Sequence, residues 1–301
     1  MKDDKRQHLQ AQVSELDSIS TAPVILQPLL QMLRQPADEI SIDRIVELVS
    51  FDGVIAAQCL RAANSALFAR CPVETARSAV MALGIDKVRS ILFGVCMNRT
   101  IPKDKWVLEA NAFWRHSLGC ALVAQCMARG IGYPEPEKAY LAGLLHDLGF
   151  LVNSVLYTSK FRECVEYASS DHSPLHNAEE RILGFTHADS GSMLCEHWGL
   201  SRELSEAAGC HHDLERMQNA GPLVCMVHLS DLLCRLRDLG YGYNEVLAVT
   251  FTDDCAWGQL AAGYPDLAKI DLVRFTLDIE GSMDQIAELV NSVFAPPRPS
   301  R

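Results

Sequence analysis

The stretch LAGLLHDLGFLVN, residues 141–153, poses the first question, because an apolar run carries a histidine and an aspartate side by side. A buried charge needs a partner, since the low-dielectric interior of a protein does not solvate it. The pair His146-Asp147 therefore lies either on an exposed helix face or beside a cation. A bound metal ion is one cation that would satisfy both side chains.

Size and charge narrow the class of protein. The chain has 301 residues, of which 49% are apolar and 22% charged, an ordinary balance for a soluble globular protein with room for two lobes. The net charge is −11. Nucleic acids and acidic membranes select clustered Lys and Arg. We therefore expect neither nucleic acid nor a membrane among the partners.

Cysteine usage indicates the compartment. The eleven cysteines are scattered singly, with no CxxC pair, and most occur in apolar helical contexts. Such residues are typical of reduced, small core side chains in the cytosol. The first residues, MKDDKRQHLQ, do not resemble a signal peptide, and no apolar run approaches the ~18 residues that span a bilayer. These features predict a cytoplasmic protein.

Helical periodicity dominates the chain, and alternating strand patterns are scarce, so we predict an all-α fold. The segment IPKDK (101–105) is the best candidate boundary between lobes. The predicted order is an N-terminal helical lobe (15–110), a second helical lobe (111–236) and a C-terminal helical extension (237–295). The first lobe should include helices over 22–34, 41–50 and 51–68, and a pair over 73–98 that breaks at Gly84.

A set of histidines and carboxylates falls on inward faces or ends of helices in the second lobe. Its members are His116, His146, Asp147, His187, His211, His212 and Asp231. Imidazole nitrogens and carboxylate oxygens are ligands that Fe, Mn, Zn or Ni accept together. A bound metal lowers the pKa of a water molecule and supplies a hydroxide that can attack phosphorus. The set predicts a divalent metal site with one or two ions.

Each of these residues also has a simpler interpretation when taken alone. The alternatives are a core histidine at His116, a helix C-terminal pair at His146-Asp147, a solvated helix N-terminus at His187, a helix end at His211-His212, and an ion pair between Asp231 and Arg235. The metal hypothesis outweighs them only if the fold brings the residues together.

The order His, His-Asp, His, His-His, Asp resembles the HD superfamily of metal-dependent phosphohydrolases. Further stretches, among them FDGVIAAQCLRAANSALF (51–68), FWRHSLGCALVAQCMA (113–128) and THADSGSMLCEHWGL (186–200), resemble the HD-related output domain, HDOD, over residues 15–236. The resemblance implies a two-lobed all-helical fold. It also implies a regulatory protein of bacterial signal transduction, without established enzymatic activity, that acts by binding a protein or a small ligand. The partner implied is a signalling protein in trans.

The second lobe also resembles HD-GYP cyclic-di-GMP phosphodiesterases, position by position. This resemblance implies one ion held by His116, His146, Asp147 and Asp231, and a second held by His187 with one or both of His211 and His212. Asp147 would bridge the two ions. The alternative function implied is a metal-dependent phosphohydrolase or phosphodiesterase that acts on a cyclic or linear nucleotide.

Two departures argue against catalysis of that kind, and a third bears on the number of metal ions. Phe150 stands where the catalytic family has a lysine that meets the substrate phosphate, and no GYP loop follows His212 closely. Ala112 replaces a glutamate that can help to hold a third metal, so three ions are not expected. The sequence therefore leaves the question of enzymatic activity open and predicts poor or no hydrolysis of cyclic-di-GMP. A nucleotide remains a candidate ligand.

Overall fold

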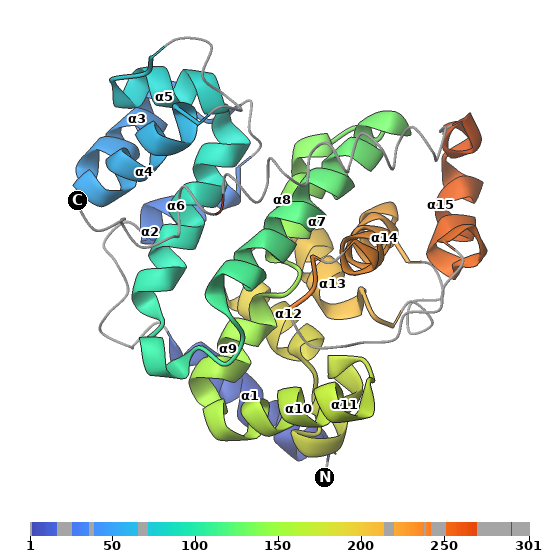
Figure 1. Ribbon diagram of the computed structural model, residues 1–301. Coiled ribbons are helices and arrows are strands. Elements are labelled where there is room, and N and C mark those ends of the chain that lie inside the picture. Colours follow the sequence, from blue (N-terminus) through green and yellow to red (C-terminus); the bar gives the residue numbers. More distant parts are fainter. Residues whose placement is uncertain are drawn as a thin grey trace. The chain divides into compact units, whose positions relative to one another are not determined.

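A computed structural model describes residues 2–16, 26–35, 39–65, 72–213, 220–237, 239–241, 251–269 and 290 (Figure 1). Every regular element within these ranges is a helix, which confirms the predicted all-α class. Of the predicted segments, 22–25 and nearly all of the C-terminal stretch 270–295 lie outside the described residues.

The chain divides into two compact units, one made of residues 22–100 with 272–301 and the other of residues 1–21 with 101–271. The helices described in the first of these units are α2 (Leu26–Leu33), α3 (Ile42–Phe51), α4 (Gly53–Ala63), α5 (Ala76–Leu83) and α6 (Ile85–Thr100). The break predicted at Gly84 is confirmed, because α5 ends and α6 begins there with a glycine φ of 79°. A left-handed conformation of this kind suits glycine, which has no Cβ to clash.

The larger unit holds the predicted metal-ligand residues. Its helices are α1 (Lys2–Ser14), η3 (Lys103–Lys105), α7 (Ala110–Gly130), α8 (Pro136–Leu145), α9 (Leu148–Leu156), α10 (Thr158–Asp171), α11 (Leu175–Ile182), α12 (His187–His197), α13 (Arg202–Cys210), α14 (Pro222–Leu236), η5 (Phe251–Asp253), α15 (Cys255–Gly263) and η6 (Pro265–Lys269). The N-terminal helix α1 packs on α12 of this unit.

The core of the larger unit is built on α7, which packs against α8 and α14, while α9 packs against α12. The contact between α7 and α8 is close because Gly143 has no side chain. A Cβ at Gly143 would lie 2.6 Å from the backbone oxygen of Cys120. This close approach places the ends of α8 and α9 beside the middle of α7, where His116 lies.

The stretch Pro136–Leu156, made of α8 and α9, is long and apolar enough by composition to cross a membrane, which the sequence analysis did not anticipate. The fold accounts for this apolar character in another way. An 18-residue window of this stretch is 89% buried within the protein, and the two helices are separated at His146-Asp147. Core helices of globular proteins are hydrophobic all round for the same reason.

Candidate metal centre

The His146-Asp147 pair forms the turn between α8 and α9, and both residues are buried. The imidazole of His146 folds back on the end of α8, where its Nδ1 donates a hydrogen bond to the carbonyl oxygen of Gly143 at 2.8 Å. A histidine there satisfies one of the carbonyls that a helix C-terminus leaves unpaired. The pair therefore both ends a helix and faces the interior.

Four other elements bring side chains to the same place. His116 lies in the middle of α7, His187 is the first residue of α12, and Asp231 lies on α14. His211 and His212 follow the end of α13. A capping box between Thr186 and Asp189 begins α12 at His187. The fold thus brings together all seven residues singled out in the sequence, and all but the half-buried His212 are buried.

Four histidines are oriented in the manner of metal ligands. The Nδ1 atoms of His116 and His211 donate to backbone oxygens of Leu239 (2.6 Å) and Ala208 (2.8 Å), as that of His146 does to Gly143. The Nδ1 of His187 donates to Glu179 Oε2 at 2.6 Å. Metal-binding histidines almost always donate their other ring N–H to a carbonyl or carboxylate. In the neutral rings each Nε2 therefore carries a lone pair, and these atoms face one another.

The first group of donor atoms gathers around His116. Its Nε2 lies 3.3 Å from His146 Nε2 and 3.2 Å from Asp231 Oδ1. Cys120 Sγ, one helical turn further along α7, lies 3.4 Å from the same nitrogen. Atoms bonded at about 2.0–2.3 Å to one tetrahedral ion stand about 3.3–3.8 Å apart. The spacing therefore fits donors arranged around a single ion.

The second group gathers around Asp147. Its Oδ1 lies 3.2 Å from His187 Nε2 and 3.4 Å from His211 Nε2, and His212 Nε2 lies 3.0 Å from His187 Nε2. The other oxygen, Oδ2, lies 2.9 Å from His146 Nε2. The carboxylate of Asp147 thus reaches both groups, as the expected bridging role requires.

Unpaired atoms and charge both fit a divalent cation. When the surrounding imidazoles are neutral, Asp147 Oδ1 and His211 Nε2 are buried without a hydrogen-bond partner. Buried polar groups normally have a partner, so each such atom requires an explanation. Three buried carboxylates, those of Asp147, Asp231 and Glu179, face one guanidinium, that of Arg235, among the described residues. This imbalance of two negative charges matches the charge of one divalent metal ion.

Without metal, protonated histidines would supply that charge. Burial lowers the pKa of His116, but hydrogen bonds to Asp147 and Asp231 outweigh it and raise the pKa to about 10. For His187, burial is likewise outweighed by the charge of Glu179 and the hydrogen bond to Asp147, and the pKa rises to about 10. Burial lowers the pKa of His211 to about 4, so that ring stays neutral.

The raised pKa values predict how the stability of metal-free protein depends on pH. A group with a higher pKa in the folded protein stabilises it fully below the unfolded pKa of about 6.5, and this contribution is lost as the pH rises toward the folded value. Chelator-treated protein should therefore melt at progressively lower temperature from pH 6.5 to 8.5. Zinc-loaded protein should not, because metal binding is favoured by neutral imidazoles. A metal-free melting temperature that stays level across this range would contradict the charge assignment.

Tyr241, Glu179 and Asn153 contribute to the site and were not among the residues singled out in the sequence. The hydroxyl of Tyr241 donates to Asp147 Oδ2. Glu179 orients His187 and accepts from Asn153 Nδ2 at 2.9 Å. Cys120 shares a helix face with His116, a spacing that the sequence does show. Arg235 pairs with Asp231 at 2.8 Å, so the simple ion pair and the inward-facing carboxylate exist together.

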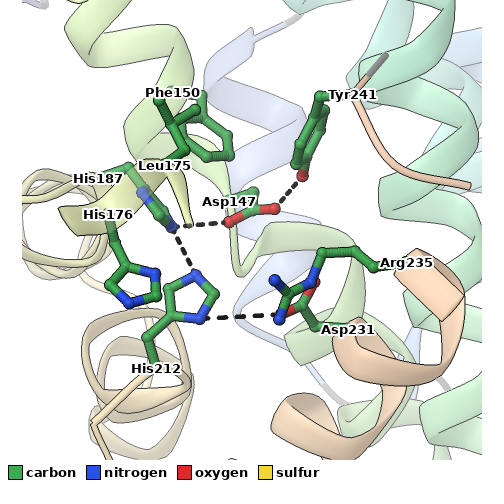
Figure 2. A pocket seen from close by; sticks show the side chains of 9 residues that line it. All are labelled: Asp147, Phe150, Leu175, His176, His187, His212, Asp231, Arg235 and Tyr241. Atoms are coloured by element: carbon green, nitrogen blue, oxygen red, sulfur yellow. Dashed lines mark hydrogen bonds and ion pairs between the residues drawn. The ribbon is translucent and has the colours of Figure 1, made fainter. Parts of the chain in front are cut away.

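The cavity beside Asp147 is small, and Figure 2 shows the side chains that line it. It is lined by Asp147, Phe150, Leu175, His176, His187, His212, Asp231, Arg235 and Tyr241. Its volume is about 10 Å³, which is room for about one water molecule. The ring of Phe150 lies 3.9 Å from that of His187 between centroids, and meets Tyr241 edge-on at 5.0 Å. The position expected to hold a phosphate-binding lysine is thus a buried apolar wall.

A sequence match assigns the family of this chain, in agreement with the geometry of the site. The HDOD domain profile matches residues 19–214. The chain belongs to the HDOD domain family. An HDOD domain protein of unknown function from Geobacter sulfurreducens shares its fold, with 27% identity, a TM-score of 0.75, and coverage of 92% of this chain and 93% of that one. The predicted family is therefore confirmed.

Two further proteins are similar to this HDOD chain, one in structure and one in sequence. A candidate phosphohydrolase from Shewanella amazonensis SB2B has 21% identity and a TM-score of 0.69, covering 95% of this chain and 98% of that one, a likeness of fold alone. An uncharacterized protein from Treponema pallidum (strain Nichols) is 24% identical over 236 residues. That match covers 77% of this chain but 45% of the relative, so the chain spans less than half the length of the curated relative it matches.

Proposed function

We propose that this HDOD chain is a regulatory signal-transduction protein whose HD-type site is a closed metal centre rather than a hydrolase active site. The closure of the centre carries this proposal. A cavity of about 10 Å³ stands beside the bridging aspartate, whereas pockets for small-molecule ligands typically measure about 300–1,000 Å³. The regulatory interaction would then be made at the surface, with a signalling protein in trans or a small ligand.

The donor count supports the same proposal. Each group offers four donor residues: His116, Cys120, His146 and Asp231 in the first, and Asp147, His187, His211 and His212 in the second. Structural zinc sites take four protein ligands, whereas catalytic sites keep one position open for water or substrate. A metal, when bound, would supply charge neutralisation and cross-linking of five helices or helix ends. The chain's own residues would hold it and exclude water.

The site also offers no unpaired positive charge to stabilise the transition state of phosphoryl transfer, among the described residues that line the cavity. The transition state of phosphodiester cleavage gains negative charge, and losing one donor for it typically costs about 10²–10³ in rate. Phe150 offers no charge, and the nearby Lys160 is exposed. Arg235 does line the cavity, but its guanidinium already pairs with Asp231.

The second candidate function is a metal-dependent phosphohydrolase acting on a nucleotide. The complete inward-facing ligand set favours it, because such a set can activate a water molecule between two ions. The position of Arg235 at the cavity favours it as well. The name of the Shewanella neighbour is consistent with this alternative, although the likeness is one of fold.

A hydrolysis assay separates the two functions. Protein loaded with zinc, manganese or iron should release no linear dinucleotide from cyclic-di-GMP above the rate with metal alone, because the substrate cannot reach the centre. Chelation should instead lower the melting temperature of the same sample. The control is Asp147→Asn, which removes the bridging carboxylate. Turnover in the wild-type protein that this variant lacks would establish the phosphohydrolase function in place of the regulatory one.

A further inference from the structure

The first donor group contains a sulfur atom that an HD-type ligand set does not require. Cys120 is buried on α7, and its Sγ faces His116 Nε2 at 3.4 Å. The sulfur lies within 4.8 Å of one potential donor atom on each of His116, His146 and Asp231. These three are residues of the proposed metal centre. The thiol therefore lies among metal-binding donors.

Packing alone does not account for this position. A buried free cysteine usually serves as a small hydrophobic core residue. Cys120 instead has His116 Nε2 as its neighbour, and in the neutral ring this nitrogen carries the lone pair because Nδ1 donates to the Leu239 carbonyl. The thiol of Cys234, on α14, also hydrogen-bonds with Cys120. Burial and this hydrogen bond both raise the pKa of the Cys120 thiol, so without a metal ion the side chain stays protonated. Deprotonation would therefore accompany metal binding, since a coordinating thiol loses its proton to the metal.

We propose that Cys120 binds the first metal ion as a thiolate, in a four-residue set with His116, His146 and Asp231. On binding, the S–H bond of Cys120 breaks, its proton passes to solvent and the sulfur bonds to the metal, with no change of oxidation state. This inference rests on the metal centre of the proposed function.

Thiolate binding has a consequence for the choice of metal. Soft sulfur ligands favour zinc or iron, whereas oxygen-rich sites suit magnesium, calcium and manganese. Among the metals that the sequence suggested, the first site should therefore take zinc or ferrous iron in preference to manganese. The second group, with three histidines and a carboxylate, carries no such preference for a soft metal.

Cobalt(II) substitution tests the proposal with an optical readout. Apoprotein titrated with cobalt should show visible ligand-field bands from the centre and, in addition, a near-ultraviolet thiolate-to-cobalt charge-transfer band. Cys120→Ser should keep the ligand-field bands and lose the charge-transfer band. The matched control is Cys126→Ser on the same helix, whose cysteine is exposed, and it should keep both.

The outcomes distinguish this inference from the function on which it rests. Absence of ligand-field bands in the wild-type protein would overturn the metal centre itself. Ligand-field bands without charge transfer, or charge transfer that survives in Cys120→Ser, would overturn thiolate binding and leave the centre intact. If Cys120→Ser does not fold, X-ray absorption of the zinc-loaded wild-type protein decides. It should show a sulfur neighbour at about 2.3 Å, and a shell of nitrogen and oxygen alone would refute the proposal.

Discussion

Asp147→Asn should empty both halves of the metal centre and destabilise the protein by about 3–5 kcal/mol, the range for removing one member of a buried ionic network. The carboxylate of Asp147 faces donors of both groups, with His146 Nε2 at 2.9 Å and His187 Nε2 at 3.2 Å. A neutral amide keeps the shape but loses the charge that holds a bridging position between two cations. Elemental analysis and urea denaturation of the purified variant measure the two effects.

The control for this variant is Asp171→Asn, a change of the same chemistry at an exposed position near the end of α10. Surface substitutions of this kind usually change the unfolding free energy by less than about 0.5 kcal/mol. The control should bind metal as the wild-type protein does. An Asp147→Asn protein with unchanged metal content would show that the carboxylate is not a ligand.

The sequence was a good guide to the helices because local signals determine them. The break between α5 and α6 at Gly84 follows from a residue that tolerates positive φ. The inward faces that carry His116 and Asp231 follow from the 3.6-residue repeat. Leucines continue on both sides of His146-Asp147, so the periodic pattern does not mark the turn there. Only the structure shows α8 ending at Leu145.

The closure of the centre could not be predicted from the sequence, because it depends on contacts between distant residues. Tyr241 reaches Asp147 across 94 positions, and its own neighbourhood in the sequence indicates a loop. Glu179 looks like an ordinary charged helix residue until α11 places it against His187. Periodicity identifies which face of a helix is buried, but it does not identify which other helix that face meets.

A simple structural role and a role as metal ligand are compatible for the same residue. Asp231 pairs with Arg235 on its own helix, as a simple ion pair would, and presents its other oxygen to His116 at 3.2 Å. A carboxylate has two oxygens and about four lone pairs, so it can serve both neighbours. His146 likewise ends a helix and supplies a donor atom. A local explanation for a residue therefore does not exclude a role in the centre.

Gly149→Ala should be the most damaging small substitution in the larger unit, with a loss of about 3–5 kcal/mol in unfolding free energy and of bound metal. A Cβ at this position would lie 1.8 Å from the backbone oxygen of His187 and 2.7 Å from Ser190 Oγ. No side-chain rotamer relieves a clash with backbone, so α9 and α12 would have to move apart. Overpacking of a tight contact usually costs about 1–3 kcal/mol, and a backbone clash belongs at or above the upper end.

The effect of Gly149→Ala on metal follows from the chain positions involved, because α9 begins directly after Asp147 and α12 begins with His187. Moving these helices apart separates the two donors that now lie 3.2 Å from each other. The matched control is Gly258→Ala in α15, where a Cβ would meet nothing within 4 Å. Alanine is the better helix former by about 0.5–1 kcal/mol, so the control should be slightly stabilised. Urea denaturation should therefore show a large loss of stability for Gly149→Ala and a small gain for Gly258→Ala, and metal analysis should show a loss for Gly149→Ala only. Both variants replace a helical glycine, but only Gly149 lies at a helix–helix contact. Equal stability of the two variants would mean that α9 and α12 do not approach closely, and the second donor group would lose its structural basis.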